Sequence, residues 1–195
     1  MKKFHFNSIN STNDFAKNLL KTSSNPKNYI NSIIIADEQT KGKGRQGKYY
    51  FSPKGDNIFI SFILKAPKEL NNPEKITVKS AEILYKIIYE ILYKNPPQKS
   101  FNFFSLKNEL RIKPINDIFY KDKKIVGILT EGVDIYSKGK PDFIILGIGI
   151  NINIDKKIIP DEFKEIIGIL SLSKSERKKL LKTLTKNILK NFKSK

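Results

Sequence analysis

Apolar side chains recur along this chain with two periods, one typical of helices and one typical of strands. They return every three or four positions from Thr12 to Thr22, again from Pro73 onward, and again after the capping-box pair Ser173 and Glu176. Short apolar or alternating runs predict strands at residues 32–36, 57–64, 109–113, 118–120, 125–130 and 142–150. The pattern predicts an α+β fold, a mixed β-sheet covered by helices, in a single domain spanning residues 1–195.

Proline and polar residues mark where several of these elements end. Pro96 and Pro97 lie beyond the long helix, so we expect residues 96–108 to be a connector. Pro114 ends the strand at 109–113 because it has no amide hydrogen to donate. The polar run 121–124 predicts the turn of a hairpin.

The chain is strongly basic, with a formal net charge of +18. Clustered cations favour nucleic acid, but nearly all the cations here are lysines in a chain also rich in Asn and Ile. We therefore interpret them as a solvated lysine surface and expect no specific nucleic-acid partner. Arginine occurs only at positions 45, 111 and 177, and Arg45 and Arg111 stand out against this bias, because a planar guanidinium meets geometric needs that lysine cannot.

Several kinds of chemistry are excluded or weakened by composition. The chain has no cysteine, which excludes disulfides and thiolate sites. Its single histidine is His5, which we expect at the surface or in packing near a mobile terminus, so histidine triads and HExxH zinc sites have little support. No apolar run approaches the ~20 residues that a membrane span needs, and we expect a cytoplasmic protein without membrane contact.

A glycine-rich cationic loop precedes the strand at 57–64. In it glycines alternate with cations: Gly42, Lys43, Gly44, Arg45, Gly47 and Lys48. Glycines allow positive φ and bring backbone amides close to a ligand, so the loop suits an anion. It is neither a Walker A loop nor a Rossmann fingerprint, because a strand follows it where those motifs need a helix. A basic surface turn fits the composition equally well.

Two strand ends carry further candidate chemistry. Lys113 ends a strand and is followed by Asn116 and Asp117, which can bind a hydroxyl or a metal ion. A lysine fixed in this way can act as a point charge on a transferring phosphoryl group. Gly147 and Gly149 permit a planar ligand to approach the backbone, although a kink in the sheet explains them too. Together these parts predict an enzyme that activates a carboxylate with a nucleotide.

Four blocks of the sequence resemble the catalytic domain of the biotin protein ligases, also called biotin–[acetyl-CoA-carboxylase] ligases. Ser-Thr-Asn at 11–13 is similar to the family's STN, and Gln39 followed by residues 42–64 is similar to GRGRxGRxWxSPxGxNLYxSxxL. Residues 113–132 are similar to KWPNDIxxxxxKxxGILxE, and residues 147–151 to GxGIN. The blocks cover most of the chain in the family's order.

The resemblance implies a fold similar to class II aminoacyl-tRNA synthetases and a two-step reaction. Biotin reacts with Mg-ATP to give biotinyl-5′-adenylate, and a lysine of a biotin carboxyl carrier protein domain then takes the biotinyl group. It also implies ATP and Mg²⁺ as cofactors and a monomer or homodimer. We expect no N-terminal DNA-binding winged helix and no small C-terminal barrel in this chain.

The resemblance also assigns site residues. The residues implied for biotin are Ser11, Thr12, Asn13, Gln39, Lys43, Gly44, Arg45 and Lys113. Those implied for ATP or the adenylate are Gly42, Lys43, Arg45, Tyr50, Asn116, Gly149 and Asn151. Lys113 and Arg45 are the implied catalytic residues, and Asn116 or Asp117 the implied metal ligand.

The chain departs from the family pattern at several of these positions. Lys43 and Lys48 replace arginines, Tyr50 replaces a tryptophan, and KPIND stands in place of KWPND. Two alternatives to a biotin ligase remain at this point. One is a lipoate or octanoate ligase of the same fold, although the chain has no RRxSGGG-like block. The other is a degenerate basic module that binds nucleic acid.

Overall fold

The computed structural model describes residues 1–67, 73–93, 109–113, 116–136 and 139–192. Within these ranges one seven-stranded sheet has the order β1-β2-β3-β7-β6-β5-β4. The strands are β1 (Lys3–Phe6), β2 (Ile33–Ala36), β3 (Ile58–Lys65), β4 (Leu110–Lys113), β5 (Asp117–Tyr120), β6 (Lys123–Val133) and β7 (Phe143–Ile150). The helices are α1 (Thr12–Thr22), α2 (Pro73–Tyr93), α3 (Asp161–Lys164) and α4 (Lys174–Asn191). The predicted α+β fold with a mixed sheet is confirmed.

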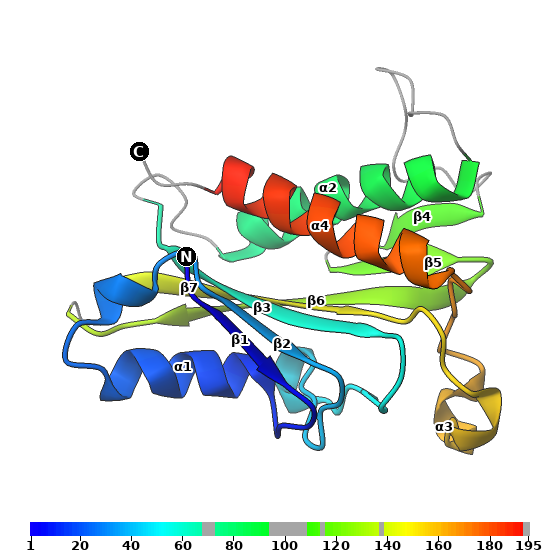
Figure 1. The fold of residues 1–195 in the computed structure, drawn as a ribbon, viewed down its shortest axis with the longest axis horizontal. Coiled ribbons are helices and arrows are strands. Elements are labelled where there is room, and N and C mark those ends of the chain that lie inside the picture. The colour runs from blue at the N-terminus through cyan, green and yellow to red at the C-terminus, as the bar shows by residue number, and fades with distance from the viewer. Residues whose placement is uncertain (68–72, 94–108, 114–115, 137–138, 193–195) are drawn as a thin grey trace.

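The sheet separates two layers of helices (Figure 1). Helices α2 and α4 lie together on one face, and α1 lies on the other. Only β1 and β2 pair in parallel, and the remaining neighbours are antiparallel. Strand β7 lies between β3 and β6, so the chain returns late to the middle of the sheet.

Each face of the sheet has its own hydrophobic cluster. Ile60 of β3 packs with Leu84 of α2 and Leu184 of α4 in the larger cluster. Ile63 packs on the opposite face with Ala16 and Leu20 of α1. Side chains alternate across a strand, so β3 is apolar at nearly every position because both of its faces are covered.

Most predicted element boundaries are confirmed to within a residue or two. Helix α1 has the predicted bounds, with Ser11 as its N-cap, and the capping box of Ser173 and Glu176 begins α4. The hairpin turn is shorter than predicted: only Lys121 and Asp122 form it, with φ of 49° and 60°, and Lys123 already begins β6. The predicted connector at 96–108 and the break at Pro114 lie outside the described residues.

The expectation that His5 lies near a mobile terminus is wrong. His5 belongs to β1, where it is the register partner of Ile35 of β2. Its Nε2 lies 2.9 Å from Asp37 Oδ1, and its side chain is exposed as expected. Strand β1 is missing from the sequence prediction because four residues at a sheet edge carry little pattern of their own.

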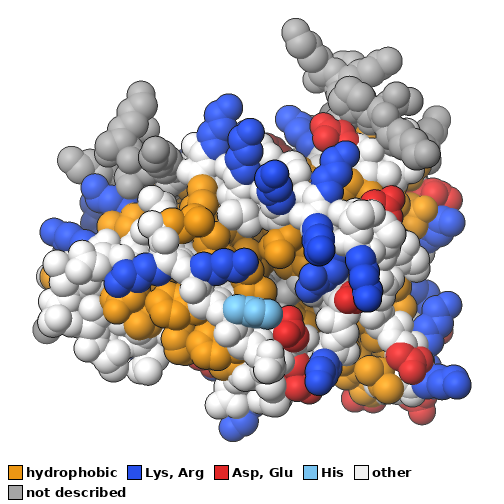
Figure 2. Space-filling model, viewed as in Figure 1, with side chains coloured by type: hydrophobic (Ala, Val, Ile, Leu, Met, Phe, Trp, Pro, Cys, Tyr) orange, Lys and Arg blue, Asp and Glu red, His pale blue; other side chains and the backbone are white. Residues whose placement is uncertain are grey.

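The surface agrees with the interpretation of the lysines as solvated charges. Figure 2 shows Lys and Arg side chains at many separate places on the visible face, with acidic side chains among some of them. No helix in the described ranges combines the length and the apolar character needed to cross a bilayer.

Candidate active site

A pocket lies where the start of α1 meets strands β6 and β7. We call it the first pocket. It is lined by seven of the eight residues implied for biotin: Ser11, Thr12, Asn13, Gln39, Lys43, Gly44 and Arg45. Glycines Gly127, Gly147 and Gly149 form part of its floor on the two strands. Residues that the resemblance assigns to one ligand, from segments distant in sequence, therefore line one pocket in the structure. Lys113 is the one residue of that set that does not line it.

Hydrogen bonds between buried polar groups hold the start of α1 in place. The backbone amide and the hydroxyl of Thr12 both donate to Gln39 Oε1, at 2.9 and 3.0 Å. Ser61 Oγ on β3 lies 2.7 Å from Thr12 Oγ1 and 2.6 Å from Asn13 Oδ1. The hydroxyl of Ser61 therefore binds the start of α1, which explains why this position of the otherwise apolar strand β3 is polar.

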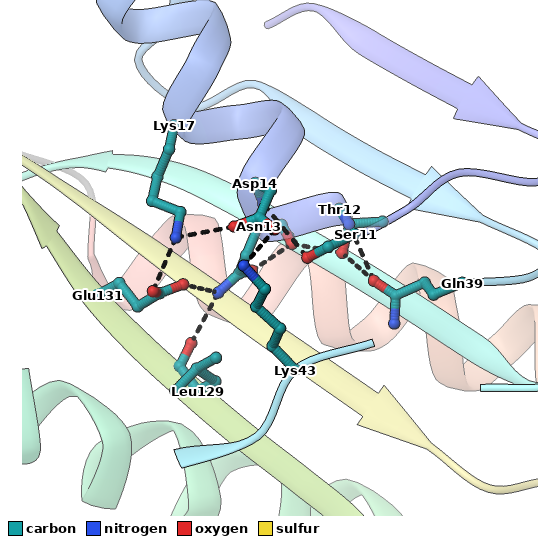
Figure 3. Close-up of polar contacts among 10 residues, drawn as sticks. Ser11, Thr12, Asn13, Asp14, Lys17, Gln39, Lys43, Leu129 and Glu131 are labelled. Atoms are coloured by element: carbon teal, nitrogen blue, oxygen red, sulfur yellow. Dashed lines mark hydrogen bonds and ion pairs between the residues drawn. The ribbon is translucent and has the colours of Figure 1, made fainter. Parts of the chain in front are cut away.

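Asn13 connects this network to a chain of charged groups (Figure 3). Its Nδ2 donates to Glu131 Oε2 on β6 at 2.7 Å, and Lys17 Nζ lies 2.9 Å from Glu131 Oε1. The same lysine lies 2.9 Å from Asp14 Oδ1, and Asp14 Oδ2 lies 2.6 Å from Lys43 Nζ of the glycine loop. Alternating charges therefore extend from β6 across α1 to the loop.

The neighbouring charged groups from Glu131 to Lys43 shift the pKa values of Asp14 and Lys17. Burial alone raises the pKa of Asp14, but the hydrogen bonds from Lys43 and Lys17 outweigh it and hold that pKa below its ordinary value. Burial alone lowers the pKa of Lys17, but Glu131 and Asp14 outweigh it and raise that pKa. Both groups are therefore held in their charged forms.

The glycine loop is built differently from the sequence prediction. Of its three glycines only Gly47 has positive φ, at 73°, and Gln46 beside it also has positive φ, at 56°. Gly42 is needed for space, because a Cβ there would lie 2.6 Å from Ser52 Oγ and would overlap the carbonyl of Tyr50. The loop folds back on itself where the amide of Gly44 donates to the Lys48 carbonyl at 2.7 Å.

Gly149 was expected to let a planar ligand approach the backbone, but the planar group that lies against it is the ring of Tyr50. Gly127 and Gly149 are register partners, and a Cβ on either would lie 2.6 Å from the ring of Tyr50. The Tyr50 hydroxyl donates to the Gly149 carbonyl at 3.1 Å. Burial, together with the charge of Asp117, raises the pKa of Tyr50, so this hydroxyl stays protonated and able to donate. Gly149 and Tyr50 both line the first pocket.

A second pocket adjoins the first and shares lining residues with it. One side of it is aromatic: the rings of Phe51 and Phe163 have centroids 6.1 Å apart at an interplanar angle of 22°, and Tyr49 lies 6.2 Å from Phe163. Its cations are Arg45, Lys48 and Lys124. An aromatic wall beside cations suits a ligand with a planar base at one end and phosphates at the other.

Asn151 lines the second pocket as a nearly fully buried side chain. Its Nδ2 donates to the Lys124 carbonyl at 3.2 Å. Its Oδ1 accepts no hydrogen bond within the described part of the chain. A buried unsatisfied oxygen is costly, so this atom is a candidate acceptor for a ligand.

Two residues implied by the resemblance lie apart from both pockets. Gly42 lines neither of them. Lys113 is the register partner of Asp117, so the two side chains lie on the same face of the sheet. Its ammonium group lies 5.4 Å from the ring centroid of Phe119 and does not line either pocket.

Asn116 and Asp117 both line the second pocket. Asp117 Oδ1 accepts a hydrogen bond from Asn116 Nδ2 at 2.9 Å and lies 2.8 Å from Lys124 Nζ. Across the described ranges no three His, Asp or Glu side chains gather into a metal site. Mg²⁺ bound to nucleotides is commonly held by one or two carboxylates and by the phosphates, so a single carboxylate fits a metal carried mainly by ATP.

Three residues of the site were missed by the sequence prediction. Lys124 and Glu131 both lie in the block at 113–132, where Lys124 was assigned to a turn and Glu131 fell beyond the predicted strand. Phe163 lies on the single turn of α3, whose four residues are too few for a periodic signal. The family lysine and glutamate in KxxGILxE were the available signal for the first two.

The chain belongs to the biotin/lipoate A/B protein ligase family, whose model matches residues 5–151. The bifunctional ligase/repressor BirA of Bacillus subtilis is 31% identical over 146 residues, which are 75% of this chain and 40% of that protein. The human biotin–protein ligase is 32% identical over 124 residues, which are 62% of this chain and 15% of that protein.

Solved structures agree with the observed fold. The biotin protein ligase of Aquifex aeolicus in complex with biotin and ATP superposes with a TM-score of 0.71 at 26% identity. The match covers 98% of this chain and 70% of that chain. The chain described here therefore corresponds to a part of its relatives, spanning 40% of the length of the BirA protein above.

Proposed function

We propose that this protein is a biotin protein ligase, which activates biotin with ATP and transfers it to a lysine of a biotin carboxyl carrier domain. The observation that carries the proposal is the pair of adjoining pockets. The first is lined by polar side chains from the start of α1 and by cations of the glycine loop, and the second has an aromatic and a cationic side. A carboxylic acid in the first and a nucleotide in the second would meet at their junction.

Biotin would be held by the polar groups that surround the first pocket. In this proposal Ser11, Thr12, Asn13 and Gln39 bind the biotin head group, because they present donors and acceptors fixed by the start of α1. The loop cations Lys43 and Arg45 line the same pocket and would neutralise the carboxylate of biotin. They are the groups that distinguish an acid substrate from a neutral one.

ATP would lie in the second pocket. The aromatic rings around Phe163 offer a stacking surface for adenine, and Asn151 Oδ1 offers an acceptor for an amino or hydroxyl group. Arg45 and Lys48 would face the phosphates. Tyr50, Asn116 and the backbone near Gly44 lie between the two ligands, since they line both pockets.

The proposed first step needs positioning and charge neutralisation but no covalent enzyme intermediate. A carboxylate oxygen of biotin attacks the α-phosphorus of ATP, and pyrophosphate leaves with the electron pair of the broken bond. Arg45 lines both pockets and would stabilise the charge that gathers on the transferring phosphoryl group, whereas Lys113, the other residue that the resemblance implies, lies outside both pockets. A Mg²⁺ ion bound with ATP would add to this neutralisation, with Asp117 or Asn116 as its protein ligand.

Lipoate or octanoate is the second candidate substrate, because the family that matches the chain includes lipoate ligases. The named relatives favour biotin, since both the human and the Aquifex proteins are called biotin protein ligases. The cationic glycine loop, which resembles that of the biotin ligases, also favours biotin.

ATP–pyrophosphate exchange in the presence of Mg²⁺ tests this proposal, because it reports adenylation without an acceptor. We expect exchange that depends on biotin and is absent with lipoate or octanoate. Exchange with lipoate and not with biotin would show that lipoate is the substrate and that the assignment of biotin is wrong. Silence with every acid, together with salt-dependent RNA or DNA binding, would favour the nucleic-acid module. Transfer of labelled biotin to a carrier domain would then test the second step.

A further inference from the structure

Backbone hydrogen bonds hold the base of the glycine loop and shape the loop itself. At the base, the amide of Lys41 donates to the Asn10 carbonyl at 2.8 Å. Within the loop, the amide of Tyr50 donates to the Gly42 carbonyl at 2.9 Å. Bonds of this second kind shape the loop without fixing its place over the first pocket. Contacts between the loop side chains and the helices therefore bear on where its cations lie.

Of the two loop cations that line the first pocket, Lys43 has the closer contact with a helix. Its Nζ lies 2.6 Å from Asp14 Oδ2 in the first turn of α1, and Figure 3 shows the lysine directed toward that carboxylate. Arg45 Nη2 lies 3.9 Å from Glu74 Oε1 in the first turn of α2, where the Glu74 side chain is 56% exposed. The first contact is a hydrogen-bonded ion pair, and the second is too long for a hydrogen bond.

Asp14 is a well-fixed acceptor for the loop. It lies in the first turn of α1, where the helix dipole favours a carboxylate, and its amide donates to Ser11 Oγ at 3.3 Å. Its second carboxylate oxygen lies 2.9 Å from Lys17 Nζ. An isolated surface ion pair orders its side chains weakly, whereas a carboxylate shared by two lysines belongs to a network. A helix residue of this kind can position a side chain of a loop.

Lys43 can bind Asp14 and a ligand at the same time. Its ammonium group has three hydrogens, so the contact with one carboxylate oxygen leaves donors for a second anion. Lys43 lines the first pocket and Asp14 does not, so Asp14 holds the lysine from outside the space that a ligand would occupy. A cation that is held in place beforehand reduces the ordering that binding would otherwise require.

We propose that Asp14 is a positioning residue, whose carboxylate holds Lys43 at the first pocket so that the carboxylate of biotin meets a cation already in place. This inference deepens the function proposed above and rests on it. Asp14 acts through Lys43 and does not touch the substrate. Its removal therefore weakens biotin binding and leaves the chemical step nearly unchanged.

Amide hydrogen exchange of the protein alone, followed by mass spectrometry, tests the hold on the loop. Asp14→Asn and Glu74→Gln each remove the charge of an acid that faces a loop cation, so they are a matched pair. We expect the amides of residues 42–50 to exchange at least about threefold faster in Asp14→Asn, with the amides of α4 unchanged. Glu74→Gln should affect the loop much less, because its contact with Arg45 is longer and more exposed.

Steady-state ATP–pyrophosphate exchange tests the consequence for the substrate. We expect Asp14→Asn to raise the KM for biotin about fivefold and to leave kcat within about twofold of the wild type. A loss of kcat with an unchanged KM would overturn the proposal, because Asp14 would then act on the reaction and not on binding.

Lys43→Met separates the loop contact from the other contact of Asp14. This variant removes the loop cation and leaves the ion pair of Asp14 with Lys17 in place. Amide exchange of residues 42–50 should be accelerated about as much as in Asp14→Asn, and the double variant should show no further acceleration. Additive effects would show that the two residues act independently and would overturn the proposal.

A purely structural role for Asp14 in α1 predicts a different outcome. In that case Asp14→Asn speeds amide exchange in α1 and leaves residues 42–50 unchanged, which overturns the proposal. Faster exchange of the loop amides with an unchanged KM for biotin also overturns it, because the position of Lys43 would then not matter to the substrate.

The proposed function is tested separately by the wild-type protein. An active wild-type protein with an unaffected Asp14→Asn variant rejects the role of Asp14 alone. A wild-type protein that neither binds biotin nor catalyses ATP–pyrophosphate exchange rejects the ligase function and, with it, the role of Asp14 toward biotin, whatever the loop amides show.

Discussion

The carboxylate of Glu131 lies 2.7 Å from the amide nitrogen of Asn13 and determines which end of that carboxamide faces Ser61. Asn13 Nδ2 donates to Glu131, so Asn13 Oδ1 is the atom that lies 2.6 Å from Ser61 Oγ. Lys17 bonds to the other carboxylate oxygen of Glu131. A strand residue that lines neither pocket thus orients a residue proposed to bind biotin.

Replacing Glu131 with alanine should therefore weaken biotin binding. A hydrogen bond to a charged group contributes about 1.5–3 kcal/mol, so we expect the KM for biotin to rise at least about tenfold with a much smaller change in the KM for ATP. Glu131→Gln keeps an oxygen that can accept from Asn13 and should have the smaller effect. Glu90→Ala, at an exposed position on α2, is the control. Equal changes in both KM values would contradict a specific role in orienting Asn13.

Gly147→Ala should displace Asn13 directly. A Cβ on Gly147 would overlap Asn13 Oδ1 and lie 2.8 Å from its Cγ, so the carboxamide would have to leave its hydrogen bonds. We expect a loss of biotin affinity on the order of tenfold or more, measured by calorimetry, because those bonds are worth about 1–3 kcal/mol.

A double-mutant cycle with Asn13→Ala checks the cause of that loss. When the Asn13 side chain is absent, the added Cβ has nothing to displace, so Gly147→Ala should cost little further affinity. Additive losses would show that Gly147→Ala acts through the backbone of β7 instead.

The central strands and longer helices could be predicted because their own side chains specify them. Ile33–Ala36 is buried at every position, and α4 carries both its apolar spacing and its capping box. Strand β1 and helix α3 have four residues each and depend on neighbours that are distant in sequence. A local pattern cannot report such elements, since their stability comes from tertiary contacts.

The site was predictable only where motifs are contiguous. The polar start of α1 and the glycine loop are local signals, and the structure places both at the first pocket. The contacts of Lys124 with Asp117 and of Glu131 with Asn13 depend on strand pairing and helix packing, which the residue pattern does not report. The residue pattern also does not report why position 149 is a glycine: a side chain there would occupy the space of the Tyr50 ring.

Asp14→Asn should remove a pH dependence on the acid side of the stability curve. The pKa of Asp14 is lowered in the folded protein from its ordinary value of 3.8. A carboxyl group with a depressed folded pKa contributes stability above its unfolded pKa, and that contribution is lost as the pH falls through the folded pKa. The wild type and Asp14→Asn should therefore differ most at roughly pH 5 and above, and converge below pH 3.8.

Urea unfolding of both proteins between about pH 2.5 and 7 measures this difference as a change in the free energy of unfolding. Asp161→Asn is the control, because the Asp161 side chain is 91% exposed. A wild-type advantage that stays constant down to the lowest pH would contradict the assignment of the shift to Asp14.

Arg177→Lys should destabilise the fold without affecting adenylation. The Arg177 guanidinium donates from Nε to the Asp56 carbonyl at 2.6 Å and from Nη2 to the Asn57 carbonyl at 2.9 Å. These bonds tie the first turns of α4 to the residues that precede β3. Lysine has no planar fork, so at least one of the two bonds is lost, which explains an arginine in a chain where lysine is otherwise the common cation.

The loss of one charged hydrogen bond should lower the free energy of unfolding by about 1–3 kcal/mol and the Tm by about 3–8 °C. Thermal unfolding followed by circular dichroism measures the shift, with Lys178→Ala at the exposed neighbouring position as the control. Exchange activity well below the Tm should be unchanged, because Arg177 lines neither pocket. A Tm equal to that of the wild type would mean that a single ammonium group satisfies both carbonyls, and the geometric reason for the arginine would be wrong.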